Sequence, residues 1–213
     1  MTGLRERKKK EVRLRIIHAA ESLFASNGIG GTTMEEIAAG AEVSVATVYN
    51  YFGTKRALLL AGVEHETDEM VADGRAVLAR PGSNPAKAVQ RLLDAYAGNL
   101  AGWDRDLLRE VLSAAFQRVG GEEITVELAA MDQRLIEQLM ALLTGFHTRD
   151  KLRPDVDVYE ATLVLFSVFT LQLFMYMSIE GYPAKDLRDQ IARQVELAFT
   201  GLAPQPSTKA KRR

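Results

Sequence analysis

The residues best suited to chemistry lie between Thr33 and Lys55, where hydroxyl, amide and basic side chains follow one another at helical spacing. On short helices, such groups hydrogen-bond phosphates and base edges. Catalysis would need a nucleophile beside a base, a phosphate loop or a metal cluster, and the chain has three scattered histidines and no cysteine. The pattern therefore predicts a binding surface and no enzyme, with no catalytic residue, cofactor or metal.

The first part of this stretch predicts a short helix that begins after Thr33. The Thr33 hydroxyl can accept from the backbone N–H three residues on, and Glu36 at that position can reach back to the Thr33 N–H, as in a capping box. The residues at helical spacing that would form the buried face are Met34, Ile37, Ala38 and Ala41.

A second short helix is expected after Ser44, which can cap it. Val48 and Phe52 stand one turn apart and would point inward. The residues left on the outward face are Val45, Ala46, Thr47, Tyr49 and Asn50. A plain helical corner would explain Val48 and Phe52 as core, but it would not explain this outward face.

The outward face suits a helix that enters the major groove of DNA. Val45 and Ala46 are small enough to touch thymine methyl groups, and Asn50 can hydrogen-bond a base edge. Thr47 can reach a base or a phosphate. The spacing predicts a helix-turn-helix with this second helix as the reader.

Phosphate contacts are expected beside the reading helix. Tyr49 and Tyr51 can donate their hydroxyls to phosphates. Thr54 can cap the next helix, whose first-turn N–H groups, together with Lys55, would form an anion site. Thr33 and Ser44 are included in the same predicted DNA-binding set.

The run IAAGAEVSVATVYNYFGTKRALL, with the helix before it, resembles the N-terminal domain of the TetR (tetracycline-repressor-like) family over about the first 60 residues. The resemblance implies an all-α fold in which the helix-turn-helix domain precedes a larger helical domain for effector binding and dimerisation. The chain departs from the family at Glu42 and Ala46, where glycine is frequent. A left-handed Glu42 would cost about 1 kcal/mol relative to glycine.

Charge is distributed unevenly along the 213 residues. The segment 1–56 carries nine Lys and Arg against six Asp and Glu, whereas 57–208 carries 14 against 22. The basic end would meet nucleic acid, and the acidic body would not. The absence of cysteine and of an apolar segment behind the N-terminal charges suits a cytoplasmic protein.

These features divide the chain into three expected parts. Residues 1–56 form the DNA-binding domain, in which 1–10 is a basic arm and a helix runs from about Glu11 to Asn27. Residues 57–202 form the effector-binding and dimerisation domain, and the helix from Lys55 to Leu78 leads into it. Residues 203–213 are too polar and rich in proline to fold.

Large, adaptable side chains in the second domain suit either a ligand pocket or an ordinary core. The candidates for the pocket that the family resemblance implies are Trp103, Phe116, Met131, Phe146 and Phe166. His65 and Glu69 have the spacing of two metal ligands on one helix face, but no third ligand is within sequence reach.

The segment from Ala161 to Ile179 is the most apolar in the chain and contains no charge. It is just long enough for a membrane span. Acidic Glu160 and Glu180 at its ends, with no basic flank, favour instead a helix packed on its own domain and on a partner. We therefore expect a homodimer through helices at about 158–180 and 184–202, and no membrane contact.

Together these expectations describe a sequence-specific regulator of transcription. The family resemblance implies a repressor released from a near-palindromic operator by a small-molecule ligand. The sequence does not fix the sign of that response. A membrane-anchored helical sensor with 161–179 as its span, or a relative acting only through protein contacts, is the alternative interpretation.

Overall fold

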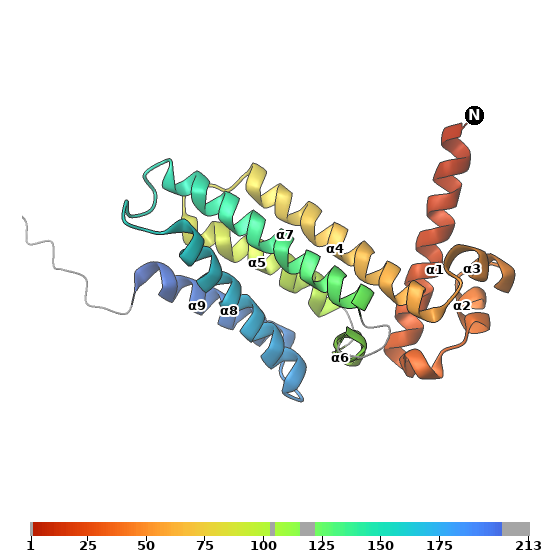
Figure 1. Ribbon diagram of the computed structural model, residues 1–213. Coiled ribbons are helices and arrows are strands. Elements are labelled where there is room, and N and C mark those ends of the chain that lie inside the picture. The colour runs from red at the N-terminus through yellow and green to blue at the C-terminus, as the bar shows by residue number, and fades with distance from the viewer. Residues whose placement is uncertain (1, 103–104, 116–121, 202–213) are drawn as a thin grey trace, which may run out of the picture.

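The computed structural model describes residues 2–102, 105–115 and 122–201, and within these ranges it contains helices and no strand (Figure 1). The all-α fold class is confirmed. In chain order the helices are α1 (Thr2–Gly31), α2 (Met34–Gly40), α3 (Val45–Phe52), α4 (Lys55–Ala79), α5 (Pro85–Gly102), α6 (Arg105–Ala115), α7 (Glu122–His147), α8 (Val158–Ser178) and α9 (Ala184–Thr200).

Helices α1, α2 and α3 and the first part of α4 pack around one apolar cluster at one end of the molecule (Figure 1). We call it the N-terminal cluster; its largest buried members are Ile16, Ile17, Phe24, Met34, Ile37, Val48, Leu58 and Leu59. The inward face predicted for α2 is buried as expected. Leu107 and Val111 of α6 also belong to this cluster, although they come from much later in the chain.

The rest of α4 packs with α5, α7, α8 and α9 around a second apolar cluster. We call it the bundle cluster; its members include Met70, Leu92, Leu93, Tyr96, Leu139, Phe146, Phe169, Leu187 and Ile191. Figure 1 shows α4 and α7 running side by side along the bundle, with α8 and α9 on its other side. The single helix α4 therefore belongs to both ends of the molecule.

Local signals set the ends of the helices in the bundle. Asn84 caps α5 by accepting from the Lys87 N–H at 3.0 Å, and Pro85 occupies the first helical position. Asp157 caps α8 by accepting from the N–H groups of Tyr159 and Glu160. Each of these boundaries has a local cause in the sequence. The predicted tail 203–213 lies outside the described residues.

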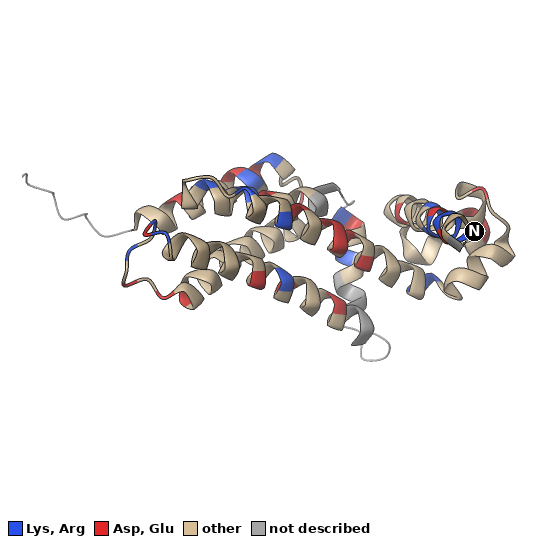
Figure 2. Ribbon diagram, turned by 90° about the horizontal axis from the view of Figure 1, so that it is seen from above, with Lys and Arg blue, Asp and Glu red and all other residues tan. Residues whose placement is uncertain are grey.

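The basic segment at the N-terminus differs from the expectation of an arm, because α1 is helical from Thr2. Its residues from Leu4 to Glu11 are good helix formers without proline, and Arg7 and Glu11 pair one turn apart at 3.6 Å. The charge run is therefore an exposed extension of α1. Figure 2 shows its Lys and Arg gathered at the projecting end of the helix. The break at Gly28, with φ of 72°, agrees with the predicted helix end at Asn27.

Helix α8 is, among the described helices, the one long and apolar enough to cross a membrane. Core helices of soluble proteins can be equally long and apolar, so length and composition alone do not indicate a membrane span. Its buried residues Leu165, Phe169 and Tyr176 pack into the bundle cluster. This packing agrees with a helix that covers its own domain.

A buried polar group joins α4 to α5 and α7. The Tyr96 hydroxyl donates to Gln138 Oε1 at 3.3 Å, and Gln138 Nε2 donates to the Val71 carbonyl oxygen at 2.9 Å. Burial raises the pKa of Tyr96 to about 12, so its hydroxyl stays a donor. Gly74 makes room for the amide: a Cβ there would lie 1.8 Å from Gln138 Oε1 and 3.0 Å from Leu92 Cδ1.

We predict that Gly74→Ala lowers the free energy of unfolding by about 1–3 kcal/mol, because the Gln138 amide must leave at least one buried partner. Urea denaturation measures this change. The control is Gly98→Ala in α5, where an added Cβ has open space and the helix should gain about 0.5–1 kcal/mol. Equal stability of the two variants would contradict the steric argument.

Candidate nucleic-acid interface

Three hydroxyl side chains fix the starts of α2, α3 and α4. Thr33, Ser44 and Thr54 accept from the backbone N–H three residues on, at 3.2, 3.1 and 3.1 Å. Thr33 also donates its own N–H to Glu36 Oε2 at 2.8 Å, which completes the predicted capping box. The Thr33 backbone N–H, and then its hydroxyl, hold the pKa of Glu36 below its ordinary value. The hydroxyls therefore orient the helices as expected.

The turn between α2 and α3 contains the left-handed residue that the sequence raised as a possibility. Glu42 has φ of 53°, and its carboxylate lies 3.9 Å from the Arg15 guanidinium. The Val43 N–H donates to the Ala38 carbonyl at 3.0 Å and closes the turn. The hydrogen bonds of the turn offset the conformational cost at Glu42.

Helix α3 presents the predicted outward face. Val48 is fully buried and Phe52 half-buried against the N-terminal cluster. On the opposite side Ala46 and Asn50 are exposed and Tyr49 is 49% exposed. Val45 and Thr47 are half-buried, and the Thr47 hydroxyl lies 2.7 Å from the hydroxyl of Ser44. Small, amide and phenol groups thus share one accessible helix surface.

Tyr51 differs from the expectation of a free phosphate donor. Its ring is half-buried, and its hydroxyl donates to the Lys9 carbonyl oxygen at 3.4 Å. The contact exists because α1 continues past α3 as a helix, so that Lys9 lies next to the end of α3. Tyr51 therefore positions α3 against α1 in this structure.

Lys55 is also engaged within the protein. Its Nζ donates to the carbonyl oxygens of Ile29 and Thr32, each at 2.7 Å, in the connection between α1 and α2. Carbonyl groups at the end of a helix attract a cation, so the ammonium has a structural partner where we expected a phosphate. The start of α4 still carries the cap at Thr54.

Arg13 is part of this surface, and the sequence analysis missed it. Its guanidinium lies 5.6 Å from the centre of the Phe52 ring and 3.8 Å from the Glu64 carboxylate. It stands one turn from Lys9 and two turns from Arg5 on α1, so the three basic residues form a row beside α3. Only the helical register of α1, which was predicted to start later, would have revealed this row.

The predicted ligand residues within the described part of the chain lie in or against the bundle cluster, which does not distinguish a pocket from a core. Met131 and Phe146 are buried in the bundle cluster, and Phe166 packs against it half-buried. Trp103 and Phe116 lie outside the described residues. Nor do the described His, Asp and Glu residues form a group of three that could hold a metal ion.

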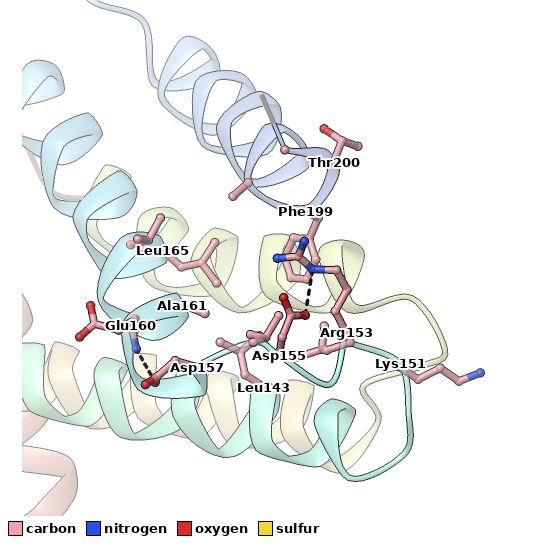
Figure 3. A pocket seen from close by; sticks show the side chains of 15 residues that line it. Leu143, Lys151, Arg153, Asp155, Asp157, Glu160, Ala161, Leu165, Phe199 and Thr200 are labelled. Carbon is pink, nitrogen blue, oxygen red and sulfur yellow. Dashed lines mark hydrogen bonds and ion pairs between the residues drawn. The ribbon is translucent and has the colours of Figure 1, made fainter. Parts of the chain in front are cut away.

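A cavity of about 480 Å³ opens between the end of α7, the connection to α8, the start of α8 and the end of α9 (Figure 3), at the end of the bundle that Figure 1 shows far from α3. Its walls include Leu143, Leu152, Ala161, Leu165 and Phe199, and its rim carries Lys151, Arg153, Asp155 and Glu160. The Arg153 and Asp155 side chains pair at 3.6 Å. These residues lie on separate helices and a loop, so no local pattern in the sequence marks them as neighbours.

A capped helix-turn-helix with an exposed reading face, joined by one helix to a larger helical bundle, defines a two-part DNA-binding regulator. The family profile described as "Bacterial regulatory proteins, tetR family" matches residues 16–61. Residues 16–61 therefore match the N-terminal domain of this TetR family of bacterial transcription regulators. The resemblance inferred from the sequence is confirmed.

Relatives extend the likeness over most of the chain. The HTH-type transcriptional repressor KstR of Rhodococcus jostii is 27% identical over 192 residues, which are 89% of this chain and 83% of KstR. A TetR-family regulator structure from Mesorhizobium loti has a TM-score of 0.74 at 21% identity and covers 89% of this chain and 95% of its own. FadR of Thermus thermophilus has a TM-score of 0.61 at 24% identity and covers 93% and 98%. This chain shares its fold with both of these structures.

We predict that Lys55→Met lowers the free energy of unfolding by about 1–3 kcal/mol, because two partly buried carbonyl groups lose a charged donor. Thermal and urea denaturation of the DNA-free protein measure it. The matched control is Lys10→Met, which removes an exposed ammonium from α1. If Lys55→Met is as stable as this control, the two carbonyl contacts do not stabilise the domain.

Proposed function

We propose that this TetR-family regulator is a cytoplasmic repressor that binds a near-palindromic operator as a homodimer and leaves it when a small molecule binds the bundle. The observation that carries the proposal is the accessible face of α3. A capped helix with Ala46, Tyr49 and Asn50 exposed on one side can lie in the major groove. Asn50 would read a base, and Tyr49 would bind a phosphate.

The other residues predicted to contact DNA fall into two groups. Thr33, Ser44, Val45, Ala46 and Thr47 lie at the starts of α2 and α3, where backbone N–H groups and small side chains can approach DNA. Tyr51 and Lys55 would act by positioning α3 and the start of α4, since their polar atoms already have partners in the protein.

Exposed apolar residues on α8 support the homodimer. Val164, Leu171 and Phe174 are exposed apolar residues on one face of α8, and with the exposed polar residues Glu160, Ser167 and Ser178 they recur at alternating steps of four and three. Val164, Leu171 and Phe174 among them are 54–58% exposed, and Leu197 of α9 adds to the apolar surface. This spacing is that of a helix-helix seam. A two-fold dimer through it would present two α3 helices to two half-sites.

The packing of α4 and α6 supports coupling between a ligand and the DNA-binding helices. Helix α4 enters both apolar clusters, and α6 contributes Leu107 and Val111 to the N-terminal cluster. Arg105 donates to the carbonyl oxygens of Ile179 and Tyr182, so α6 is also bound to the end of α8. A ligand that moves α4 or α6 would change the separation of the α3 helices.

The bundle offers two regions for such a ligand. Met131, Phe146 and Phe166 belong to the helices that a ligand would have to separate, and the cavity in Figure 3 is open between α7, α8 and α9. The Thermus thermophilus FadR structure is a complex with lauroyl-CoA. A long-chain acyl-CoA is therefore the first ligand to test.

Selection from random duplex DNA tests the proposal directly. The wild-type protein should enrich a near-palindromic site, and Asn50→Ala should bind that site about 5- to 150-fold more weakly, because one base contact is lost. Lauroyl-CoA is then tested for release of the selected site. The control is Gln133→Ala, on the exposed surface of α7. If no sequence is enriched, or Asn50→Ala binds as tightly, α3 does not read DNA.

The proposed dimer predicts that Phe174→Asp gives a monomer, because a buried charge would face its own copy across the two-fold axis. Sedimentation equilibrium without detergent measures the mass. Val126→Asp changes an exposed valine of α7 in the same way and should leave the dimer intact. A dimer that survives Phe174→Asp would place the interface elsewhere, and a wild-type protein found only in the membrane fraction would favour a span at α8.

A further inference from the structure

An unusual carboxyl group lies where α1 crosses α4. Oε1 of Glu21 is buried and accepts no hydrogen bond from the described residues. It faces Gly62 of α4, where an added Cβ would lie only 3.0 Å from this oxygen. The missing side chain at Gly62 thus lets the carboxyl group approach the α4 backbone. Burying a carboxylate without a donor is costly, whereas the neutral acid is much easier to bury.

The charges around Glu21 also favour the neutral acid. Burial, followed by the charges of Glu66 and Glu69 on α4, raises the pKa of Glu21 to about 7 from an ordinary 4.5. His65 lies in the same contact: its Nε2 is 3.8 Å from Glu69 Oε1, and its ring centre is 5.6 Å from that of His18 on α1. Two histidines and three carboxyl groups therefore gather at one helix crossing.

Four arginines described on α1 and α6 have other partners. Arg56 of α4 has a buried Nη2 without a hydrogen-bond partner among the described residues, but it is not among the causes that shift the pKa of Glu21. Arg13 and Arg15 of α1 face Glu64 and Glu42, at 3.8 and 3.9 Å. On α6, which also packs against α1, Arg109 binds the Met177 carbonyl and Asp106. Arg105 is held at the same end of α8. These four arginines bind elsewhere, so the charged and titratable groups around the Glu21 carboxyl group are the two histidines and the acidic residues of α4.

We propose that the contact between α1 and α4 is a proton-dependent joint, closed while Glu21 is protonated and loosened when Glu21 loses its proton. The joint lies between the helices that hold α3 and the helix that runs into the bundle. Its opening would change how the DNA-binding helices sit on the dimer. The effect on DNA rests on the proposed function, whereas the proton binding itself does not.

The direction of the pH dependence follows from the two states of the chain. The folded protein keeps the Glu21 proton up to about pH 7, whereas the unfolded chain releases it near 4.5. The folded state therefore binds more protons between these values, and the free energy of unfolding falls as the pH rises from 4.5 to 7. Glu21→Gln keeps the neutral form at every pH and should lose this part of the slope.

The first experiment uses the DNA-free full-length protein. Urea midpoints are measured from pH 5 to 8, with EDTA in every buffer so that a bound metal ion cannot produce the response. The midpoint of Glu21→Gln should fall less over this range than that of the wild type. Glu6→Gln removes an exposed carboxylate from the same helix and should follow the wild type. Parallel profiles for wild type and Glu21→Gln would overturn the proposal.

Two further variants separate Glu21 from its neighbours. Gly62→Ala should displace the carboxyl group and flatten the wild-type profile, because the added Cβ would lie only 3.0 Å from Glu21 Oε1. The double variant His18→Gln, His65→Gln should keep the part of the profile that depends on Glu21. If this double variant removes the whole difference between wild type and Glu21→Gln, the histidines bind the proton and the assignment to Glu21 is wrong.

The second experiment measures affinity for the selected operator at constant salt. Wild-type affinity should fall roughly threefold or more between pH 6.5 and 8, and that of Glu21→Gln by less than about twofold. If neither protein binds DNA at any pH, the proposed function fails while the urea profiles still test the joint. If wild type and Glu21→Gln lose affinity equally, the joint does not control DNA binding.

Discussion

The structure depends on one constraint: a single helix, α4, must pack into two apolar clusters at once. Its first turns, with Leu58 and Leu59, complete the core under α3, and from Met70 onward it lies in the bundle. A rigid helix shared in this way cannot shift at one end without disturbing the packing at the other. The position of α1, α2 and α3 is therefore tied to the packing of the bundle.

Polar groups at intervals along α4 fix its register more sharply than apolar packing would. The Lys55 ammonium holds the connection between α1 and α2, and the Gln138 amide binds the Val71 carbonyl oxygen further along. Apolar contacts tolerate small sliding motions, whereas a hydrogen bond to a particular carbonyl group is lost by a movement of about 1 Å. Between these two fixed points lies Glu21, whose buried oxygen has no such partner. The crossing of α1 with α4 therefore lacks a hydrogen bond at Glu21 Oε1 of the kind that Lys55 and Gln138 make elsewhere along α4.

Local features of this fold could be predicted from the sequence, because their causes lie within four residues. The caps at Thr33, Ser44 and Thr54, and the buried position of Val48 in α3, follow from hydroxyl and apolar spacing alone. The roles of Tyr51 and Lys55 could not be predicted, since their partners are 42 and 26 residues away. The assignment of Met131 and Phe146 to a ligand pocket stays a prediction, because large apolar side chains of this kind suit a pocket and a core alike and both residues are buried in the bundle cluster.

Helix α6 gives the two ends of the molecule a second connection. One side of it contributes Leu107 and Val111 to the N-terminal cluster, while Arg105 and Arg109 hold the carbonyl end of α8. Helix α8 also carries the exposed apolar seam of the proposed dimer. The distance between two α3 helices would then depend on α8 through α6 as well as on the bundle through α4. In the proposed mechanism, a ligand would have to bind better to an arrangement in which α4 or α6 has moved, so its differential affinity would have to exceed the cost of repacking that connection.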